Sequence, residues 1–91
     1  MSNVIVTRHK GLIEWLSLRG ITGTVVEHAT PDQVSGKHVF GILPLNLAAL
    51  TSAITTVDMS GLRPDQRGKD LTPDEMDAAG ATLTTYVVKV V

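Results

Sequence analysis

The chain has 91 residues and no cysteine, so we expect one small domain, residues 1–91, without disulfide bonds or a cysteine-ligated metal. Its formal net charge of −1 excludes the uniformly basic surface of proteins that bind long nucleic acids through bulk charge. A chain of this size buries a modest core, which a second subunit would extend. The lack of cysteine fits a reducing compartment, and we expect a cytoplasmic protein.

Targeting signals are the next class to consider. Met1 is followed by neither a basic start nor a small-residue cleavage site, so we expect no signal peptide. Residues 39–57 carry no charge and are long enough for a transmembrane helix. Gly41 and Pro44 interrupt this stretch, together with several Ser, Thr and Asn residues. A strand, a helix and another strand are the better interpretation, and we expect no membrane association.

Hydrophobic periodicity predicts alternating strands and helices in chain order. We expect strands at residues 4–6, 24–26, 38–43, 55–59 and 82–91, and helices at 10–19, 44–50 and 73–79. Residues 31–37 and 60–71 are predicted loops. Thr72 and Glu75 form a capping-box pattern before the last helix, and the second helix is apolar on most sides and expected to be buried.

This order of elements predicts a single α/β domain with a mostly parallel sheet and helices on both faces. The long last strand is expected either to lie antiparallel to its neighbour or to reach a partner subunit.

Basic residues gather after two of the predicted strands. Of the eight in the chain, Arg8 and Lys10 follow the first strand, and Arg63, Arg67 and Lys69 follow the fourth. Ligands of open α/β sheets bind beyond the carboxyl ends of the strands. Arginine offers forked donors to phosphate and lysine a point charge, so we expect a phosphate-like ligand there.

Uncharged residues complete the predicted site. Thr7 and Asn46 are suited to orient a ligand by hydrogen bonds, and Pro44 begins a helix whose first N–H groups face an anion. Gly68 lets the backbone approach closely. His9 is the only imidazole at the predicted site, and histidine moves protons near neutral pH.

Each of these features also has an ordinary structural explanation. Arg8 and Lys10 are typical of solvated residues at a helix start, residues 67–69 of a polar turn, and His9 of a side chain that bonds a neighbouring carbonyl. Four other residues have a strand, loop, core or interface position as their simpler interpretation: Trp15, His28, His38 and Asp58. The residues alone predict a generic anion-binding α/β domain.

Familiar catalytic motifs are missing from the sequence. We find no Walker loop, dinucleotide fingerprint, nucleophile elbow or zinc-protease motif. The acidic residues Asp74, Glu75 and Asp77 lie in a predicted first helical turn, where the helix dipole accounts for them. We therefore expect neither a bound metal nor a cofactor.

Three motifs follow one another along nearly the full chain. They are Val6-Thr7-Arg8-His9 with Gly11 and Glu14-Trp15, Gly41-Ile42-Leu43-Pro44 with Asn46-Leu47-Ala48, and Arg67-Gly68-Lys69-Asp70-Leu71. As a set they resemble a small CRISPR-associated accessory family of type III loci. Lys10 departs from the small or proline residue of that family and makes the first loop more basic.

This resemblance implies a Rossmann-like, CARF-like fold and a ring nuclease. Such an enzyme cleaves cyclic oligoadenylate messengers, here cyclic tetra-adenylate, without metal and switches off the antiviral response. The implied mechanism is attack of a 2′-hydroxyl on its own phosphodiester, which leaves a 2′,3′-cyclic phosphate. The expected catalytic residues are His9, Arg8, Arg67 and Lys69, and the expected ligand-binding residues are Thr7, Lys10, Pro44, Asn46, Arg63 and Gly68.

The resemblance also implies a homodimer with the ligand across its two-fold axis. We expect the interface at Trp15 or Leu18 on the first helix, or at the strand 86–91, and favour the strand. Two other functions stay open. One is a module that binds the messenger without cutting it, and the other is a structural subunit whose basic loops contact a protein or an RNA.

Overall fold

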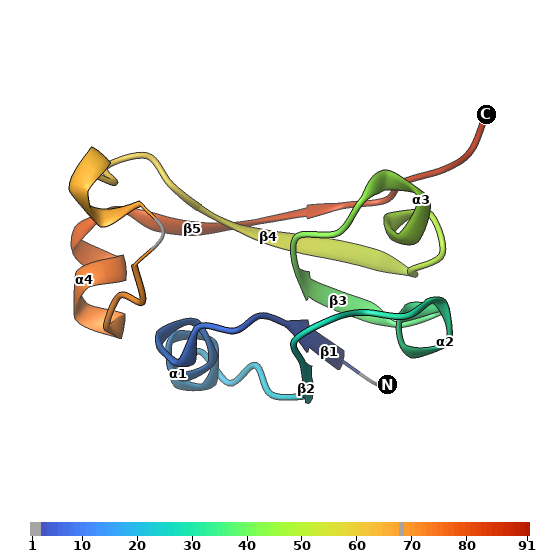
Figure 1. The fold of residues 1–91 in the computed structure, drawn as a ribbon, viewed down its shortest axis with the longest axis horizontal. Coiled ribbons are helices and arrows are strands. Elements are labelled where there is room, and N and C mark those ends of the chain that lie inside the picture. The colour runs from blue at the N-terminus through green and yellow to red at the C-terminus, as the bar shows by residue number, and fades with distance from the viewer. Residues whose placement is uncertain (1–2, 68) are drawn as a thin grey trace.

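The computed structural model describes residues 3–67 and 69–91 as one α/β domain (Figure 1). Its single sheet has the strand order β2-β1-β3-β4-β5. The strands are β1 (Asn3–Val6), β2 (Thr24–Val26), β3 (His38–Gly41), β4 (Ala53–Met59) and β5 (Ala81–Tyr86). The first four are parallel and β5 pairs antiparallel with β4. The mostly parallel sheet is confirmed, and the last strand takes the antiparallel position.

Helices cover both faces of the sheet. They are α1 (Lys10–Leu18), α2 (Pro31–Val34), α3 (Leu45–Ala48), α4 (Pro73–Ala78) and the 3-10 helix η1 (Pro64–Gln66). Alternate residues of a strand point to opposite faces, so Ile5 packs with α1 and α4 while Val4 packs with α2 and α3. The two resulting clusters form the core. The first contains Ile5, Trp15, Leu16, Phe40, Leu71 and Met76, and the second contains Val4, Val34, Val39, Ala48 and Ile54.

Both predicted loops contain a short helix, and in the loop expected at residues 60–71 it is η1. The segment expected to be irregular at residues 31–37 begins with α2, in which Pro31 occupies the first position. The Gln33 side-chain oxygen accepts a hydrogen bond from the Thr30 N–H at 3.0 Å. This is the same kind of start that identified α4, where the Thr72 and Glu75 side chains each bond the other residue's backbone N–H.

The strands differ from the prediction at their ends. β3 stops at Gly41 rather than at residue 43, because the backbone there has a φ of 138°. β4 begins at residue 53 rather than 55. β5 starts at residue 81 and stops at 86, so residues 87–91 do not continue the strand as expected.

The predicted buried helix at residues 44–50 is a single turn. Pro44 is its N-cap rather than its first residue, and α3 ends at Ala48. Ala48 is buried against the sheet, whereas Leu45 is 76% exposed. One turn presents only one side to the sheet, so the expectation of burial on most sides was wrong.

Trp15 joins α1 to α4 in the core. It is 1% exposed, and its indole N–H donates a hydrogen bond of 2.8 Å to Asp77. The Arg19 guanidinium lies 3.6 Å from the centre of the Trp15 ring and also donates to Asp77, at 3.0 Å. Trp15 is therefore a core residue, and the expectation that it forms a dimer interface was wrong.

Two other polar side chains have the structural positions that we expected. His38 lies on β3, stacks on Phe40 and contacts the Thr55 hydroxyl at 2.6 Å. Asp58 accepts hydrogen bonds from the hydroxyls of Thr56 and Thr84 on the β4–β5 ribbon.

In the part of the chain that the structure describes, no helix is long and apolar enough to cross a membrane.

The N-terminal turn of α1 packs directly on the segment that precedes α4. A Cβ atom at Gly11 would lie 1.6 Å from the Leu71 carbonyl oxygen, so no larger residue fits there without moving the backbone. The Gly11 N–H donates a hydrogen bond of 3.1 Å to the Asp70 carboxylate. This contact brings residues 69–71 beside the start of α1.

Gly11→Ala is expected to lower the free energy of unfolding by about 2 kcal/mol or more, because α1 and Leu71 must separate. Urea unfolding followed by circular dichroism measures the loss. Ser17→Ala, on the exposed side of the same helix, is the control and should change stability by less than about 0.5 kcal/mol. Equal stability of the two variants would contradict the close approach.

Asp77→Asn is expected to lower the melting temperature at pH 7. Hydrogen bonds from Trp15 and Arg19 hold the pKa of Asp77 below its ordinary value of 3.8. Because the folded-state pKa is the lower one, the stabilisation is complete well above pH 3.8 and is lost as the pH falls through the folded pKa. The melting temperatures of wild type and variant should therefore converge in acid. Asp74→Asn is the control, because it removes the same charge from α4 without affecting the bond to Trp15. A loss of melting temperature at pH 7 as large as that of Asp77→Asn would contradict this account.

Candidate functional site

A pocket of about 410 Å³ lies beyond the carboxyl ends of β1, β3 and β4. In the sheet, β2 and β3 lie on opposite sides of β1, so the direction in which the chain adds strands reverses after β2. Doubly wound sheets bind their ligands at such a switch point. The pocket therefore lies beyond the carboxyl ends of the strands, where the sequence predicts a ligand.

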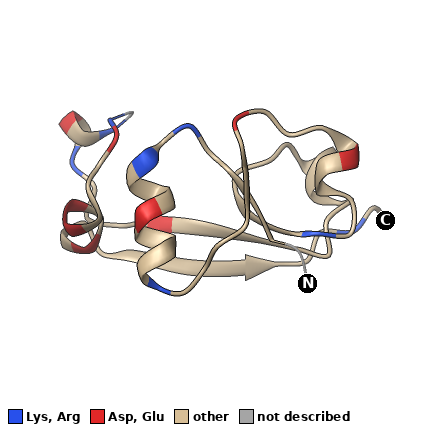
Figure 2. Ribbon diagram, turned by 90° about the horizontal axis from the view of Figure 1, so that it is seen from below, with Lys and Arg blue, Asp and Glu red and all other residues tan. Residues whose placement is uncertain are grey.

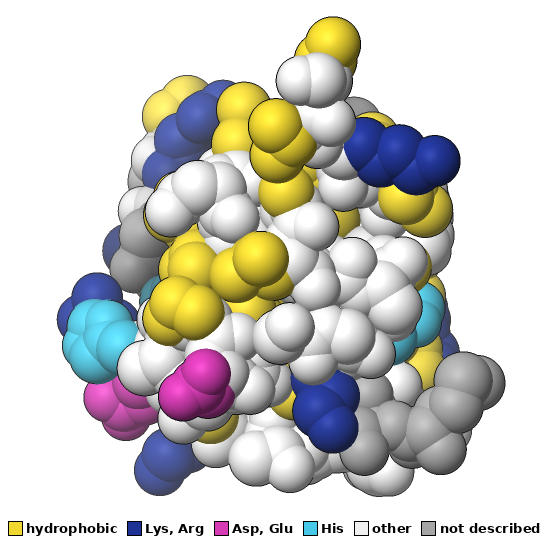
Figure 3. Space-filling view, turned by 90° about the vertical axis from the view of Figure 1, so that its right-hand side faces the viewer, with side chains coloured by type: hydrophobic (Ala, Val, Ile, Leu, Met, Phe, Trp, Pro, Cys, Tyr) yellow, Lys and Arg dark blue, Asp and Glu magenta, His cyan; other side chains and the backbone are white. Residues whose placement is uncertain are grey.

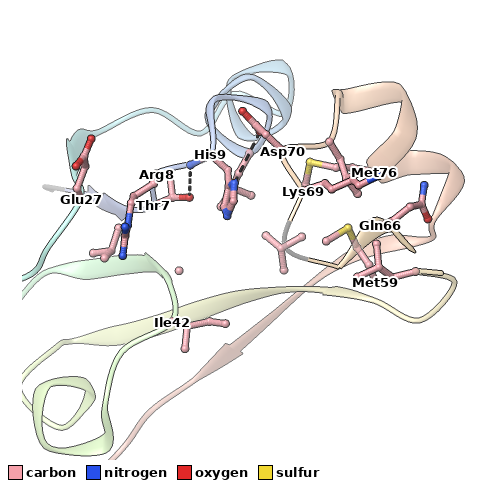
Figure 4. Close-up of a pocket in the computed structure, with 16 residues that line it drawn as sticks. Thr7, Arg8, His9, Glu27, Ile42, Met59, Gln66, Lys69, Asp70 and Met76 are labelled. Atoms are coloured by element: carbon pink, nitrogen blue, oxygen red, sulfur yellow. Dashed lines mark hydrogen bonds and ion pairs between the residues drawn. The ribbon is translucent and has the colours of Figure 1, made fainter. Parts of the chain in front are cut away.

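The β1–α1 connection places His9 over this pocket. Thr7 follows β1 and is almost fully buried, and its hydroxyl accepts a hydrogen bond of 3.1 Å from the His9 N–H. His9 is the N-cap residue of α1 but makes no side-chain cap bond to the helix. Its ring is half-exposed and extends from the backbone into the open space of the pocket (Figure 4).

Asp70 reaches the same place from the loop between β4 and α4. Its Oδ1 atom accepts the hydrogen bond from Gly11 and lies 4.0 Å from His9 Nδ1. Figure 4 shows the two side chains facing each other at the pocket wall. The carboxylate thus takes the backbone donor at the start of α1 that a phosphate would otherwise use.

The charged side chains around the pocket are mixed. Arg8 and Lys69 line it, but so do Glu27 and Asp70. In the described ranges, residues 3–67 and 69–91, no carboxylate forms an ion pair with Arg8 or Lys69. Acidic and basic residues also intermingle around α1, η1 and α4 (Figure 2). The site is less basic than the clustering of Arg and Lys in the sequence predicted.

The floor of the pocket is apolar. Its hydrophobic lining comes from α1, β4, the loop after β4 and α4: Leu12, Val57, Met59, Leu62, Leu71 and Met76. Met59 and Gln66 lie on the side of the pocket opposite Arg8, and Ile42 lies across from His9 (Figure 4). An apolar floor with a few convergent polar groups is typical of small-molecule sites. Thioether and aliphatic side chains suit the face of a planar aromatic group.

The structure brings four of the predicted site residues together: Thr7, Arg8, His9 and Lys69. Five others do not line the pocket, namely Lys10, Pro44, Asn46, Arg63 and Arg67. Asn46 is exposed on the single-turn α3, and Arg63 pairs with Asp65 at 3.5 Å. Arg67 is exposed at the end of η1. Gly68 lies outside the described residues.

Three polar residues of the pocket were not predicted: Glu27, Gln66 and Asp70. Glu27 directly follows β2, so the strand-end argument, extended to the second strand, would have included it. Asp70 stands beside Lys69 in the third motif. A carboxylate in that motif and the imidazole of His9 in the first motif could have been considered as an interacting pair. No pattern in the sequence pointed to Gln66 as a pocket residue. Its side-chain oxygen accepts a hydrogen bond from the Arg63 N–H within the η1 turn.

Metal ligands do not gather at this pocket. Over residues 3–67 and 69–91, no group of three or more His, Asp or Glu side chains is placed to hold a metal ion.

Comparison with known proteins identifies a family. Residues 4–89 match a family model described as "Putative CRISPR-associated protein (Cas_VVA1548)". No curated protein and no solved structure gives a significant match. The matched segment includes the switch-point pocket and nearly the whole sheet. The chain therefore belongs to this family of CRISPR-associated proteins.

Proposed function

We propose that the protein is a ring nuclease that cleaves cyclic oligoadenylate, with cyclic tetra-adenylate as the expected substrate, and so ends type III CRISPR signalling. One observation carries this proposal: Arg8, His9 and Lys69 converge on an apolar-floored pocket at the switch point of the sheet. The combination suits a nucleotide, whose base is planar and apolar-faced and whose phosphate is anionic. Membership of a CRISPR-associated family supports it.

The pocket has the size for one nucleotide rather than for a whole ring. A volume of about 410 Å³ is near the lower end for small-molecule sites, and a cyclic tetranucleotide exceeds it. In the proposed arrangement one base lies on the Met59 side and its phosphate lies near Arg8 and His9. Lys10 and Arg67 adjoin lining residues in sequence, so the part of the ring outside the pocket would reach them.

A two-fold dimer would supply a second, identical pocket for the opposite nucleotide of the ring. Exposed hydrophobic side chains gather at the end of the molecule that carries α3 and the C-terminal segment (Figure 3). They include Leu45, Val87 and Val90, and Leu18 is exposed on α1. These surfaces are the candidates for the interface, and the preference for residues 86–91 stays a prediction.

The proposed reaction is an internal transfer that consumes no water. The 2′-oxygen of one ribose attacks the adjacent phosphorus, the O2′–P bond forms and the P–O5′ bond breaks. The products are a 2′,3′-cyclic phosphate and a 5′-hydroxyl, so one proton leaves the 2′-oxygen and one reaches the 5′-oxygen. His9 is the only histidine in the lining and would move a proton. Arg8 and Lys69 would stabilise the charge on the phosphoryl oxygens.

A binding module that holds the messenger without cutting it is the alternative. The two carboxylates of the lining, Glu27 and Asp70, favour it, because they reduce the positive potential available to a phosphoryl transition state.

Incubation of the protein with cyclic tetra-adenylate in EDTA, followed by chromatography of the products, tests the proposal. We expect linear products with a 2′,3′-cyclic phosphate, formed over many turnovers. Tight binding of an intact ring would support the binding module instead. Absence of any interaction would contradict both functions and favour a structural subunit.

His9→Ala is expected to lower the cleavage rate by about 10²–10⁴-fold while the dissociation constant stays within about threefold, because the imidazole acts on protons rather than on affinity. Single-turnover kinetics and fluorescence binding measure the two quantities. His28→Ala is the control, since His28 is an exposed histidine beyond β2 that does not line the pocket. Unchanged turnover in the His9→Ala variant would show that His9 does not transfer a proton in the reaction.

Arg8→Ala and Lys69→Ala are each expected to weaken binding and to reduce the dependence of log K on log salt by about 0.7, the value for one phosphate contact on a single strand. Binding is measured in the His9→Ala background, so that the ring stays intact. Arg63→Ala removes an arginine that pairs with Asp65 outside the pocket and should leave the slope unchanged. A slope as steep in the Arg8 and Lys69 variants as in their parent would remove these residues from the phosphate site.

A further inference from the structure

Asp70 and His9 are held close together by neighbours on two separate elements. The His9 N–H is bound to the hydroxyl of the buried Thr7. Asp70 directly precedes Leu71, which is buried in the core cluster with α1. The Asp70 carboxylate is fixed in turn by the Gly11 N–H. These contacts fix the backbone of His9 and the carboxylate of Asp70, and His9 Nδ1 then lies 4.0 Å from Asp70 Oδ1.

This geometry gives the two imidazole nitrogens different surroundings. Nδ1 faces the carboxylate at 4.0 Å, and the rest of the ring extends into the pocket (Figure 4). An ionised carboxylate only accepts hydrogen bonds, so it favours the tautomer with the proton on Nδ1. A closure of about 1 Å would bring the pair to hydrogen-bond distance, and catalytic hydrogen bonds commonly tighten when substrate binds.

We propose that Asp70 is a positioning residue for His9. It holds the proton on Nδ1, so that the unprotonated Nε2 faces the ligand and can take a proton from it. Once His9 has accepted that proton, the carboxylate remains an acceptor for Nδ1–H and keeps the ring oriented. The role in catalysis rests on the proposed function, in which His9 moves a proton, whereas the tautomer itself does not.

The tautomer of His9 in the free protein is the first test. Long-range ¹H–¹⁵N correlation spectra of histidine-labelled protein, recorded at a pH where histidine is neutral, separate Nδ1–H from Nε2–H, and His9→Ala assigns the signal. We expect mainly Nδ1–H in the wild type and a shift towards Nε2–H in Asp70→Asn. The asparagine can still accept the Gly11 N–H, but it can also turn an N–H donor towards His9. Glu27→Gln changes the other carboxylate of the lining and should leave the His9 signal unchanged.

Mainly Nε2–H in the wild type would overturn the proposal, and so would an identical tautomer ratio in the wild type and Asp70→Asn. The wild-type spectrum decides by itself if the variant does not fold. Cleavage kinetics form the second test: Asp70→Asn should lower the turnover rate by about 10–10³-fold and change affinity by less than about threefold. If the protein shows the expected His9 tautomer but cleaves no ring, the proposed function is contradicted while the effect of Asp70 on the tautomer stands. The two proposals can therefore fail separately.

Discussion

The contact between Gly11 and Leu71 decides where several polar side chains of the pocket lie. Helix α1 is connected directly to β1, but Lys69 and Asp70 belong to a loop that leaves β4, two strands away in the sheet. Only a residue without a side chain lets the Leu71 backbone approach the first turn of α1. Leu71 and Met76 then complete the core beneath α1. The same packing that stabilises the fold thereby forms one wall of the pocket.

The mixed charge of the pocket fits a small, defined ligand better than a long polymer. Glu27 and Asp70 offset Arg8 and Lys69, so attraction at long range is weak and recognition depends on contacts at short range. The apolar floor contributes affinity for a flat group without adding charge. Under the proposed function this balance would favour turnover, because a strongly basic pocket would retain an anionic product.

Local chemistry determined most of the architecture. The short β-branched run Val4–Val6 predicts the strand β1, and the capping pattern from Thr72 to Glu75 predicts the start of α4 from four residues. The order of these elements then restricts the sheet to a mostly parallel one with helices on both faces. The position of Thr7, Arg8 and His9 at the carboxyl end of β1 follows from the same order, whereas the spatial order of the strands, and with it the switch point, comes from the tertiary structure.

Contacts distant in sequence decided the rest. The acceptor of the Gly11 N–H lies 59 residues away and that of the Trp15 indole 62 residues away, so no local pattern identified Asp70 or Asp77 as their partners. Pro44 and Asn46 miss the pocket because the chain turns away at Gly41 and leaves Ile42 83% exposed. A strand-end rule finds the edge of the sheet at which a site forms. Which side chains share the pocket depends on how each loop packs, and only the tertiary structure determines that.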